Sequence, residues 1–169
     1  MRTRRWLAAF PLLWAWGCTD NSGAHGVDAG GNDEFTVGSL DFHVSSGTAR
    51  IAGGVLGFFL TDQPDACQAI TSAPAQPTVV LSVRAVAQVD GTTMASVVAP
   101  RPTPLPGQAG GSLVRQVSGT TTASYDTATG SVSWSLDSDG RYAIPAIDVG
   151  FADVSGRVTL SGLRVGVCP

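Results

Sequence analysis

The end of the chain is its most constraining feature. Residues 156–169 alternate apolar and polar side chains, and the alternation changes phase at Gly162, between Leu160 and Leu163. A period of two is typical of a strand that buries one face. The strand ends on Cys168, so a disulfide formed there would hold the last strand against an earlier part of the chain.

The same alternation recurs throughout the chain after its N-terminal segment, where no stretch has a helical stripe longer than two turns. The clearest strand is 79–89, and Asp90-Gly91 predicts a hairpin that returns over 92–98. The 21 glycines and 10 prolines favour many short strands joined by turns. We therefore predict one all-β domain over 35–169, an antiparallel β-sandwich or, alternatively, a partly open β-barrel.

Four local patterns give finer expectations. The nearly continuous apolar run 55–60 predicts a strand covered on both faces. Asp62 is a suitable N-cap for a single helical turn that presents Cys67. The sequence at 126–130 predicts a turn, and the slip of the alternation at Gly38 predicts a β-bulge.

The first seventeen residues are typical of a secretory signal peptide rather than of a folded element. Three arginines stand at positions 2, 4 and 5, and an apolar run of about eleven residues follows over 6–16. This run is too short to span a bilayer as a helix. We predict that residues 1–17 direct export and are removed.

The signal ends in a motif that resembles the lipoprotein box of bacteria. Gly17 and Cys18 match a box in which a small residue precedes a cysteine that becomes lipidated, whereas Ala15 and Trp16 depart from its usual residues. General signal peptidase would also cut before Cys18. The resemblance predicts a lipid on Cys18, and Thr19 in place of aspartate favours the outer membrane of the cell envelope.

A polar, glycine-rich segment follows the cysteine. Residues 18–34 hold almost no apolar side chains, so they cannot bury enough surface to fold and are predicted to form a flexible tether. About 16 residues of such a coil would span roughly 20–24 Å. The oxygen-bearing side chains of this segment lack the spacing of a calcium loop, namely Asp28, Asn32, Asp33 and Glu34.

The three cysteines predict one disulfide. An exported protein seldom keeps a spare thiol, and lipidation of Cys18 leaves Cys67 and Cys168 as an even pair. Extracytoplasmic compartments are oxidising, which favours a bond between these two residues.

The order of motifs also resembles that of a loose group of secreted lipoproteins from environmental bacteria, myxobacteria among them. The resemblance covers 55–169 and implies a β domain with a Cys67–Cys168 bond, but it implies no activity. It rests on short motifs in a fixed order: Leu60-Thr61-Asp62, Pro64-Asp65-Ala66-Cys67, Thr129-Gly130-Ser131-Val132, Val154-Ser155-Gly156, Val158 and Cys168-Pro169.

The sequence favours a protein that is not an enzyme. After the tether, His43 is the sole histidine, and no G-x-S-x-G motif is present. One histidine and no free cysteine do not make a zinc or copper site, and Asp137 to Gly140 holds only a fragment of a calcium loop, so we predict no cofactor or metal. After residue 17 there are seven arginines and thirteen acidic residues, a net charge of −6, which argues against nucleic acid as a partner.

We therefore expect a lipid-anchored, non-catalytic protein of the cell envelope, whose partner is the membrane. The alternative is an envelope module that binds a glycan or a protein, and a hydrolase is the less favoured third function. Trp134 and Tyr125 are the candidate residues for stacking against a sugar, although Trp134 alternates with Val132 and Leu136 as a core residue would. Prolines at every second position over 100–106 predict an extended crossover or surface loop.

Overall fold

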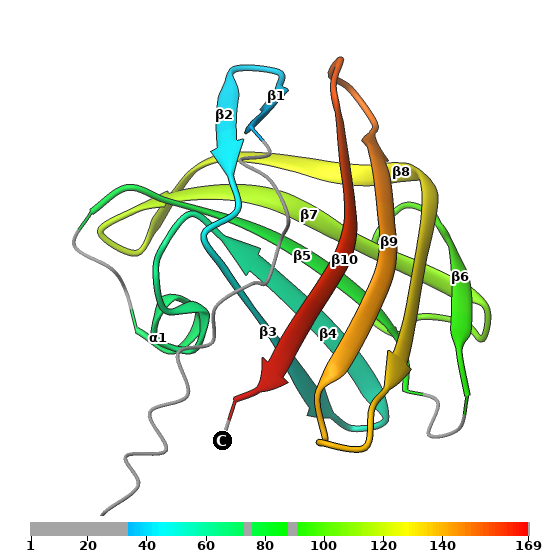
Figure 1. The fold of residues 1–169 in the computed structure, drawn as a ribbon. Coiled ribbons are helices and arrows are strands. Elements are labelled where there is room, and N and C mark those ends of the chain that lie inside the picture. The colour runs from blue at the N-terminus through cyan, green and yellow to red at the C-terminus, as the bar shows by residue number, and fades with distance from the viewer. Residues whose placement is uncertain (1–33, 73–75, 88–90, 169) are drawn as a thin grey trace, which may run out of the picture.

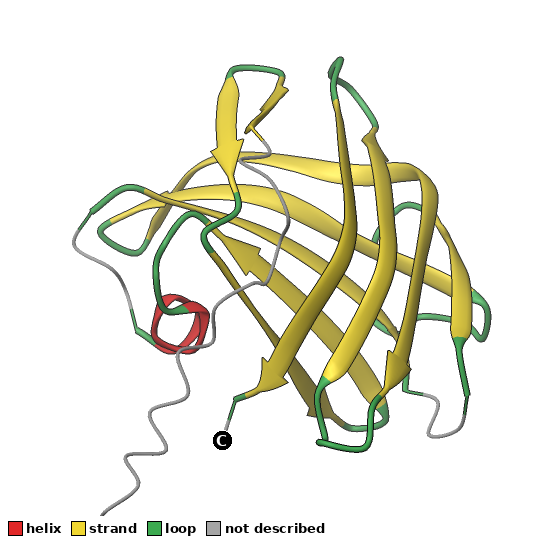
Figure 2. Cartoon of the chain, viewed as in Figure 1, coloured by secondary structure: helices red, strands yellow, loops and turns green. Residues whose placement is uncertain are grey.

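The computed structural model describes residues 34–72, 76–87 and 91–168, and in this part the protein is a closed β-barrel. Eight strands follow one another around the barrel in the order β10-β3-β4-β5-β7-β6-β8-β9. Figure 2 shows strands throughout and one short helix beside them. The predicted all-β class is confirmed, and of the two predicted arrangements the structure has the barrel, which is closed.

The strands vary in length from four residues to seventeen. Their bounds, with that of the helix, are β1 Glu34–Val37, β2 Leu40–His43, β3 Ser46–Ala52, β4 Val55–Thr61, α1 Ala66–Thr71, β5 Thr78–Val86, β6 Thr93–Val97, β7 Gln108–Val117, β8 Thr120–Leu136, β9 Tyr142–Phe151 and β10 Arg157–Val167.

The barrel closes where the last strand meets the first strand of the barrel, a contact that we call the seam. Strand β10 pairs with β3 in parallel, and only Gly166–Thr48 and Val167–Ala49 are in register. The Cys168 N–H extends the pairing by donating to the Ala49 carbonyl oxygen at 3.1 Å. Most other pairings are antiparallel as predicted, but β6 and β7 also run parallel.

A disulfide and the helix α1 lie beside the seam. Cys67 in α1 is bonded to Cys168 just beyond β10, with 5.6 Å between their Cα atoms and a separation of 101 positions in sequence. The predicted disulfide is therefore present. In addition, the Thr48 hydroxyl lies 3.0 Å from the Cys168 sulfur, which has no hydrogen in the disulfide and can only accept a hydrogen bond. The bond thus holds the end of β10 against β3 through the helix.

The helix begins later than its predicted cap. Asp65, not Asp62, is the N-cap, and its carboxylate accepts a hydrogen bond from the Gln68 N–H at 3.0 Å. Asp62 instead accepts from the Val79 N–H at 3.0 Å, and its own N–H donates to the Val79 carbonyl oxygen at 3.3 Å, so it lies against the start of β5. Among the described residues, no helix has the length and apolar character needed to cross a membrane.

The interior of the barrel is filled by the inward-facing side chains of its strands. Phe58 lies in the centre of this core, and its ring contacts those of Trp134 and Tyr142 edge to face, each with 5.7 Å between ring centroids. Phe58 and Trp134 are nearly inaccessible to solvent. On β10, Leu160 and Leu163 are both buried, as the change of phase at Gly162 predicts.

The pairing around β6 differs from the prediction. The predicted hairpin between 79–89 and 92–98 does not form, because β7 lies between β5 and β6 in the barrel. Gly111 on β7 permits this order: a Cβ there would lie 1.7 Å from the Ser82 carbonyl oxygen of β5. Asp90 itself lies outside the described residues.

The predicted turn at 126–130 is also wrong, since β8 continues through it with a shift of register between Thr127 and Thr129. At this point β8 separates from β7, and β6 lies between them towards the other end of the barrel. The buried Thr127 hydroxyl joins the diverging segments, as it accepts from the Gly111 N–H at 2.9 Å and donates to the Val98 carbonyl oxygen at 2.7 Å.

We expect Thr127→Val to lower the free energy of unfolding by about 1–3 kcal/mol, because it keeps the shape of the side chain but leaves a buried N–H and a buried C=O without that hydroxyl. Urea unfolding followed by the fluorescence of Trp134, the sole tryptophan after residue 17, measures the change. The matched control is Thr129→Val at an exposed position of the same strand. Equal unfolding midpoints for the two variants would contradict this role.

The hairpin β1–β2 covers one end of the barrel (Figure 1). Gly38 lies in the two-residue turn of this hairpin, with a φ of +59°. The alternation slips at this turn, and the pairing of β1 with β2 is regular, so the predicted β-bulge is absent. The Gly38 N–H donates to the Ser155 carbonyl oxygen at 3.0 Å, and Phe42 is buried. The hairpin thus joins the core of the barrel.

Candidate functional site

The predicted residues of the anchor lie outside the described residues. These are the signal peptide 1–17, the lipidated Cys18 and the tether up to residue 33, including Asp28, Asn32 and Asp33. Glu34, the last predicted residue of the tether, is the first residue of β1. The structure places Cys67 and Cys168 together at the seam.

The histidine of the domain is exposed. His43 ends β2 and stands opposite Glu34 of β1 at the edge of the terminal hairpin. In the part of the chain that the structure describes, no three His, Cys, Asp or Glu side chains are grouped so that they could hold a metal ion.

The two aromatic residues named as sugar-stacking candidates have other positions. Trp134 is 2% exposed and packs in the core. Tyr125 is partly buried, and its hydroxyl lies 3.1 Å from the Ser39 hydroxyl in the β1–β2 turn. Hydrogen bonds from the Ser39 side chain and backbone lower the pKa of Tyr125. Tyr125 therefore holds the hairpin to the barrel, and neither ring forms an open platform.

The aspartate of the predicted calcium fragment organises a turn between β8 and β9. Asp137 accepts from the N–H groups of Asp139 and Arg141 at 3.0 and 2.9 Å, and its carboxylate is paired with Arg164 of β10. The backbone hydrogen bond from Arg141 is the main cause that lowers the pKa of Asp137. Because this pKa is lower in the folded protein than in the unfolded chain, the charged Asp137 carboxylate stabilises the fold at pH values above its unfolded pKa. That stabilisation is lost as the pH falls through the folded pKa.

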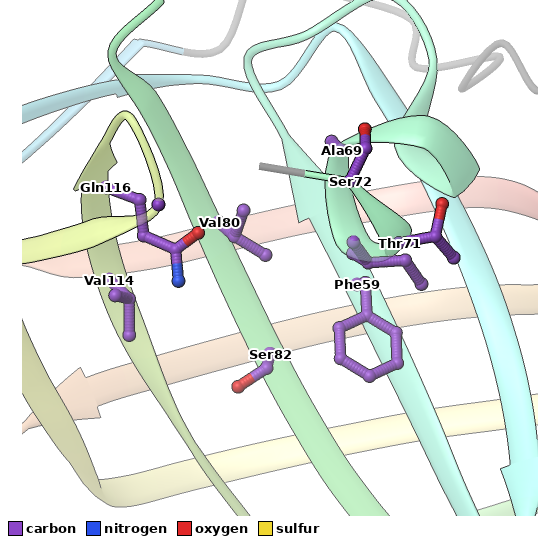
Figure 3. Close-up of a pocket in the computed structure, with 10 residues that line it drawn as sticks. Phe59, Ala69, Thr71, Ser72, Val80, Ser82, Val114 and Gln116 are labelled. Atoms are coloured by element: carbon purple, nitrogen blue, oxygen red, sulfur yellow. The ribbon is translucent and has the colours of Figure 1, made fainter. Parts of the chain in front are cut away.

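A groove on the outer surface of the barrel is a stronger candidate for a site. It has a volume of about 380 Å³ and lies between helix α1 and the turn that joins β7 to β8. Figure 3 shows Phe59 and Ser82 on the sheet face below the helix, with Gln116 on the strand beyond them. The groove is lined by Phe59, Ala69, Ile70, Thr71, Ser72, Val80, Ser82, Val114, Gln116 and Gly119.

The groove combines an apolar floor with polar groups at its sides. Phe59, Val80 and Val114 are partly buried and face outward, because they alternate with the inward-facing residues of β4, β5 and β7. The Ser82 hydroxyl donates to the Ser112 carbonyl oxygen at 3.3 Å and accepts from the Ser112 N–H at 3.4 Å, which leaves one of its two lone pairs for a ligand. Among the described residues, the Gln116 side-chain amide forms no hydrogen bond.

A second hollow adjoins the groove at Phe59. It has a volume of about 280 Å³ and includes Arg50, Gly57 and Arg84. Arg50 and Arg84 stand opposite Gly57 from the strands on either side of it, so both side chains emerge on the outer face. Neither guanidinium forms a hydrogen bond or an ion pair within the described part of the chain.

The two hollows together form a surface that we call the Phe59 groove, lined by the residues of both. Ligand sites in proteins are concave and mostly apolar, with a few polar groups that fix orientation. The interpretation of 55–60 as covered on both faces is therefore only partly correct, since the outward face of Phe59 borders open hollows. The adjacent pair Phe58-Phe59 is the signal that could have revealed this, because neighbouring residues of a strand face opposite sides.

Comparison of the chain with models of protein families, with curated proteins and with solved structures finds no match.

Proposed function

We propose that the protein is a lipoprotein of the cell envelope, exported by residues 1–17 and anchored through a lipid on Cys18. The observation that carries the proposal is Gly17-Cys18 directly after a short apolar run with arginines before it. The disulfide supports it: of three cysteines in the chain, two are bonded to each other, which leaves Cys18 for the lipid. The tether then places the barrel roughly 20–24 Å from the membrane surface.

In this proposal the barrel acts without catalysis, and the outer membrane is its location. The exposed position of His43 at the end of β2 supports this proposal over a hydrolase, since a general base needs a nucleophile within hydrogen-bonding reach. Thr19 after the lipidated cysteine is the feature that favours the outer membrane.

Cys18→Ser tests the anchor. We expect the wild-type protein to sediment with membranes and the variant to appear in the soluble exported fraction, because the acyl chains are lost and each buried CH₂ contributes about 0.8 kcal/mol to membrane binding. Fractionation of cells with immunodetection measures the distribution. Thr19→Ser is the matched control and should stay in the membrane fraction. A Cys18→Ser protein that remains with membranes would contradict the proposal.

A second candidate function, the binding of a ligand in the envelope, is favoured by the Phe59 groove. Its partly buried aromatic floor and two guanidinium groups that have no partner among the described residues are features of a binding surface rather than of an inert one. This function is compatible with the lipid anchor, which would hold the binding module at the membrane.

A further inference from the structure

The charge of the Phe59 groove is opposite to that of the molecule. The chain after residue 17 carries a net charge of −6, yet the described residues that line the two hollows include Arg50 and Arg84 and no acidic side chain. Two of the other arginines are paired, Arg157 with Asp148 at 2.6 Å and Arg164 with Asp137. Because Arg50 and Arg84 lie together in one hollow and form no ion pair within the described residues, the groove favours an anionic partner.

The spacing of the two arginines follows from the sheet. Since Gly57 lies opposite both residues, their Cα atoms are two strand spacings apart, about 9–10 Å. Gly57 has no side chain, and the edge of the Phe59 ring covers it, so Gly57 is buried. A carboxylate in the hollow that Arg50 and Arg84 both line could accept hydrogen bonds from one or both guanidinium groups, which are well shaped to pair with it.

The aromatic ring is placed next to this anion site. A Cβ built on Gly57 would lie 2.9 Å from the Phe59 ring and 3.6 Å from Cγ of Arg84, so the ring and the arginine stem border the same spot. Beyond the ring lie Ser82 and Gln116 (Figure 3). The groove therefore offers, in order, positive charge, an apolar ring face, and hydroxyl and amide groups.

We propose that the Phe59 groove binds an acidic glycan, a chain of sugars that carry carboxylates. The carboxylate of one sugar lies between Arg50 and Arg84, the apolar C–H face of a sugar ring packs on Phe59, and hydroxyl groups bond to Ser82 and Gln116. An acidic peptide could also pair with the two arginines. Its flexible acidic side chains, however, offer no rigid face to pack on Phe59 and no row of hydroxyl groups to bond to Ser82 and Gln116. The proposal rests on the ligand-binding function given above and does not depend on the lipid.

Calorimetric titration of the protein purified in detergent tests the proposal with tetragalacturonate as probe. We expect binding that weakens as salt is raised, and much weaker binding of the neutral cellotetraose and of tetraglutamate. Arg50→Gln and Arg84→Gln should each lower the affinity by about tenfold to a hundredfold, because each variant loses charge-assisted hydrogen bonds to the carboxylate. Phe59→Ala should lower it between about twofold and tenfold.

Arg141→Gln is the matched control, because it removes the same charge from an exposed turn outside the groove, and it should bind as the wild type does. The fluorescence of Trp134 verifies that each variant is folded. Absence of tetragalacturonate binding at millimolar concentration would overturn the proposal, as would equal losses in Arg141→Gln and Arg84→Gln. Equal or tighter binding of tetraglutamate would overturn it in favour of an acidic peptide. None of these results bears on whether Cys18 is lipidated.

Discussion

Replacing both cysteines of the disulfide, in Cys67→Ala with Cys168→Ala, is expected to lower the free energy of unfolding by about 2–5 kcal/mol. The bond joins residues that are 101 apart in sequence, so its loss returns much conformational freedom to the unfolded chain. It also leaves the seam dependent on two residue pairs, the Cys168 N–H hydrogen bond and the hydrogen bond from the Thr48 hydroxyl to the Gly166 carbonyl oxygen. Such a loss is large against the total stability of a typical domain, about 5–15 kcal/mol.

Urea unfolding of the wild type under oxidising and reducing conditions, beside the double variant, measures this effect. The reduced wild type and the variant should unfold at similar urea concentrations, both well below the oxidised wild type. Amide hydrogen exchange should locate the change. In the reduced wild type, the backbone N–H groups of Cys168 and of the residues that pair β10 with β3 should exchange faster than in the oxidised protein. Three coincident unfolding curves would contradict the role of the bond in closing the barrel.

Phe58→Ala is expected to cost about 3–5 kcal/mol. The substitution removes the ring that contacts both Trp134 and Tyr142, and it leaves a cavity that the closed sheet cannot collapse to fill. The burial of Phe58 is almost complete, at 1% exposed. Thermal or urea unfolding measures the loss, and the emission of Trp134 should change in the folded state because its neighbour is missing.

The adjacent residue provides the control. Phe59→Ala removes the same side chain from the same strand, but from the outer face, where Phe59 borders the groove. We expect it to cost less than about half as much, because surrounding atoms cover only part of the ring. If the two variants were equally destabilised, the assignment of Phe58 to the core and Phe59 to the surface would be wrong.

Local patterns predicted the strands better than they predicted strand partners. The final strand could be recognised from alternation alone, and its change of phase at Gly162 corresponds to a glycine with φ +69° between two buried segments. The partner of 79–89 could not be recognised, because pairing depends on residues far apart in sequence. The pairing of β5 with β7 needs a glycine at position 111, because a Cβ there would collide with the Ser82 carbonyl oxygen of β5. The sequence alone does not reveal this need, since it depends on which strand lies beside Gly111.

The segment 126–130 shows a second limit. Asp, Thr and Gly favour turns, but the hydroxyl of Thr127 is used inside the barrel to join β7 with the segment after β6. Burial with satisfied hydrogen bonds therefore outweighed local preference. The disulfide was predictable for a different reason, since the number of cysteines and the predicted export restrict the choice of partner without any knowledge of the fold.

The candidate site was less accessible to sequence reasoning. Trp134 and Tyr125 were named because aromatic residues are few, but one packs in the core and the other holds the terminal hairpin. Arg50 and Arg84 are 34 positions apart, and only the register of three strands shows that they flank Gly57. A binding surface assembled across strands leaves no compact motif in the sequence.

The mass of the intact protein, extracted from envelopes with detergent, tests the lipid anchor most directly. The account predicts a chain that begins at Cys18 and is heavier than its amino acids by a diacylglyceryl group, with or without one further N-terminal acyl chain. All of the added mass should lie in the N-terminal peptide. The Cys18→Ser protein should lack that mass. A wild-type chain that begins at residue 18 without added mass, or that retains residues 1–17, would contradict the account.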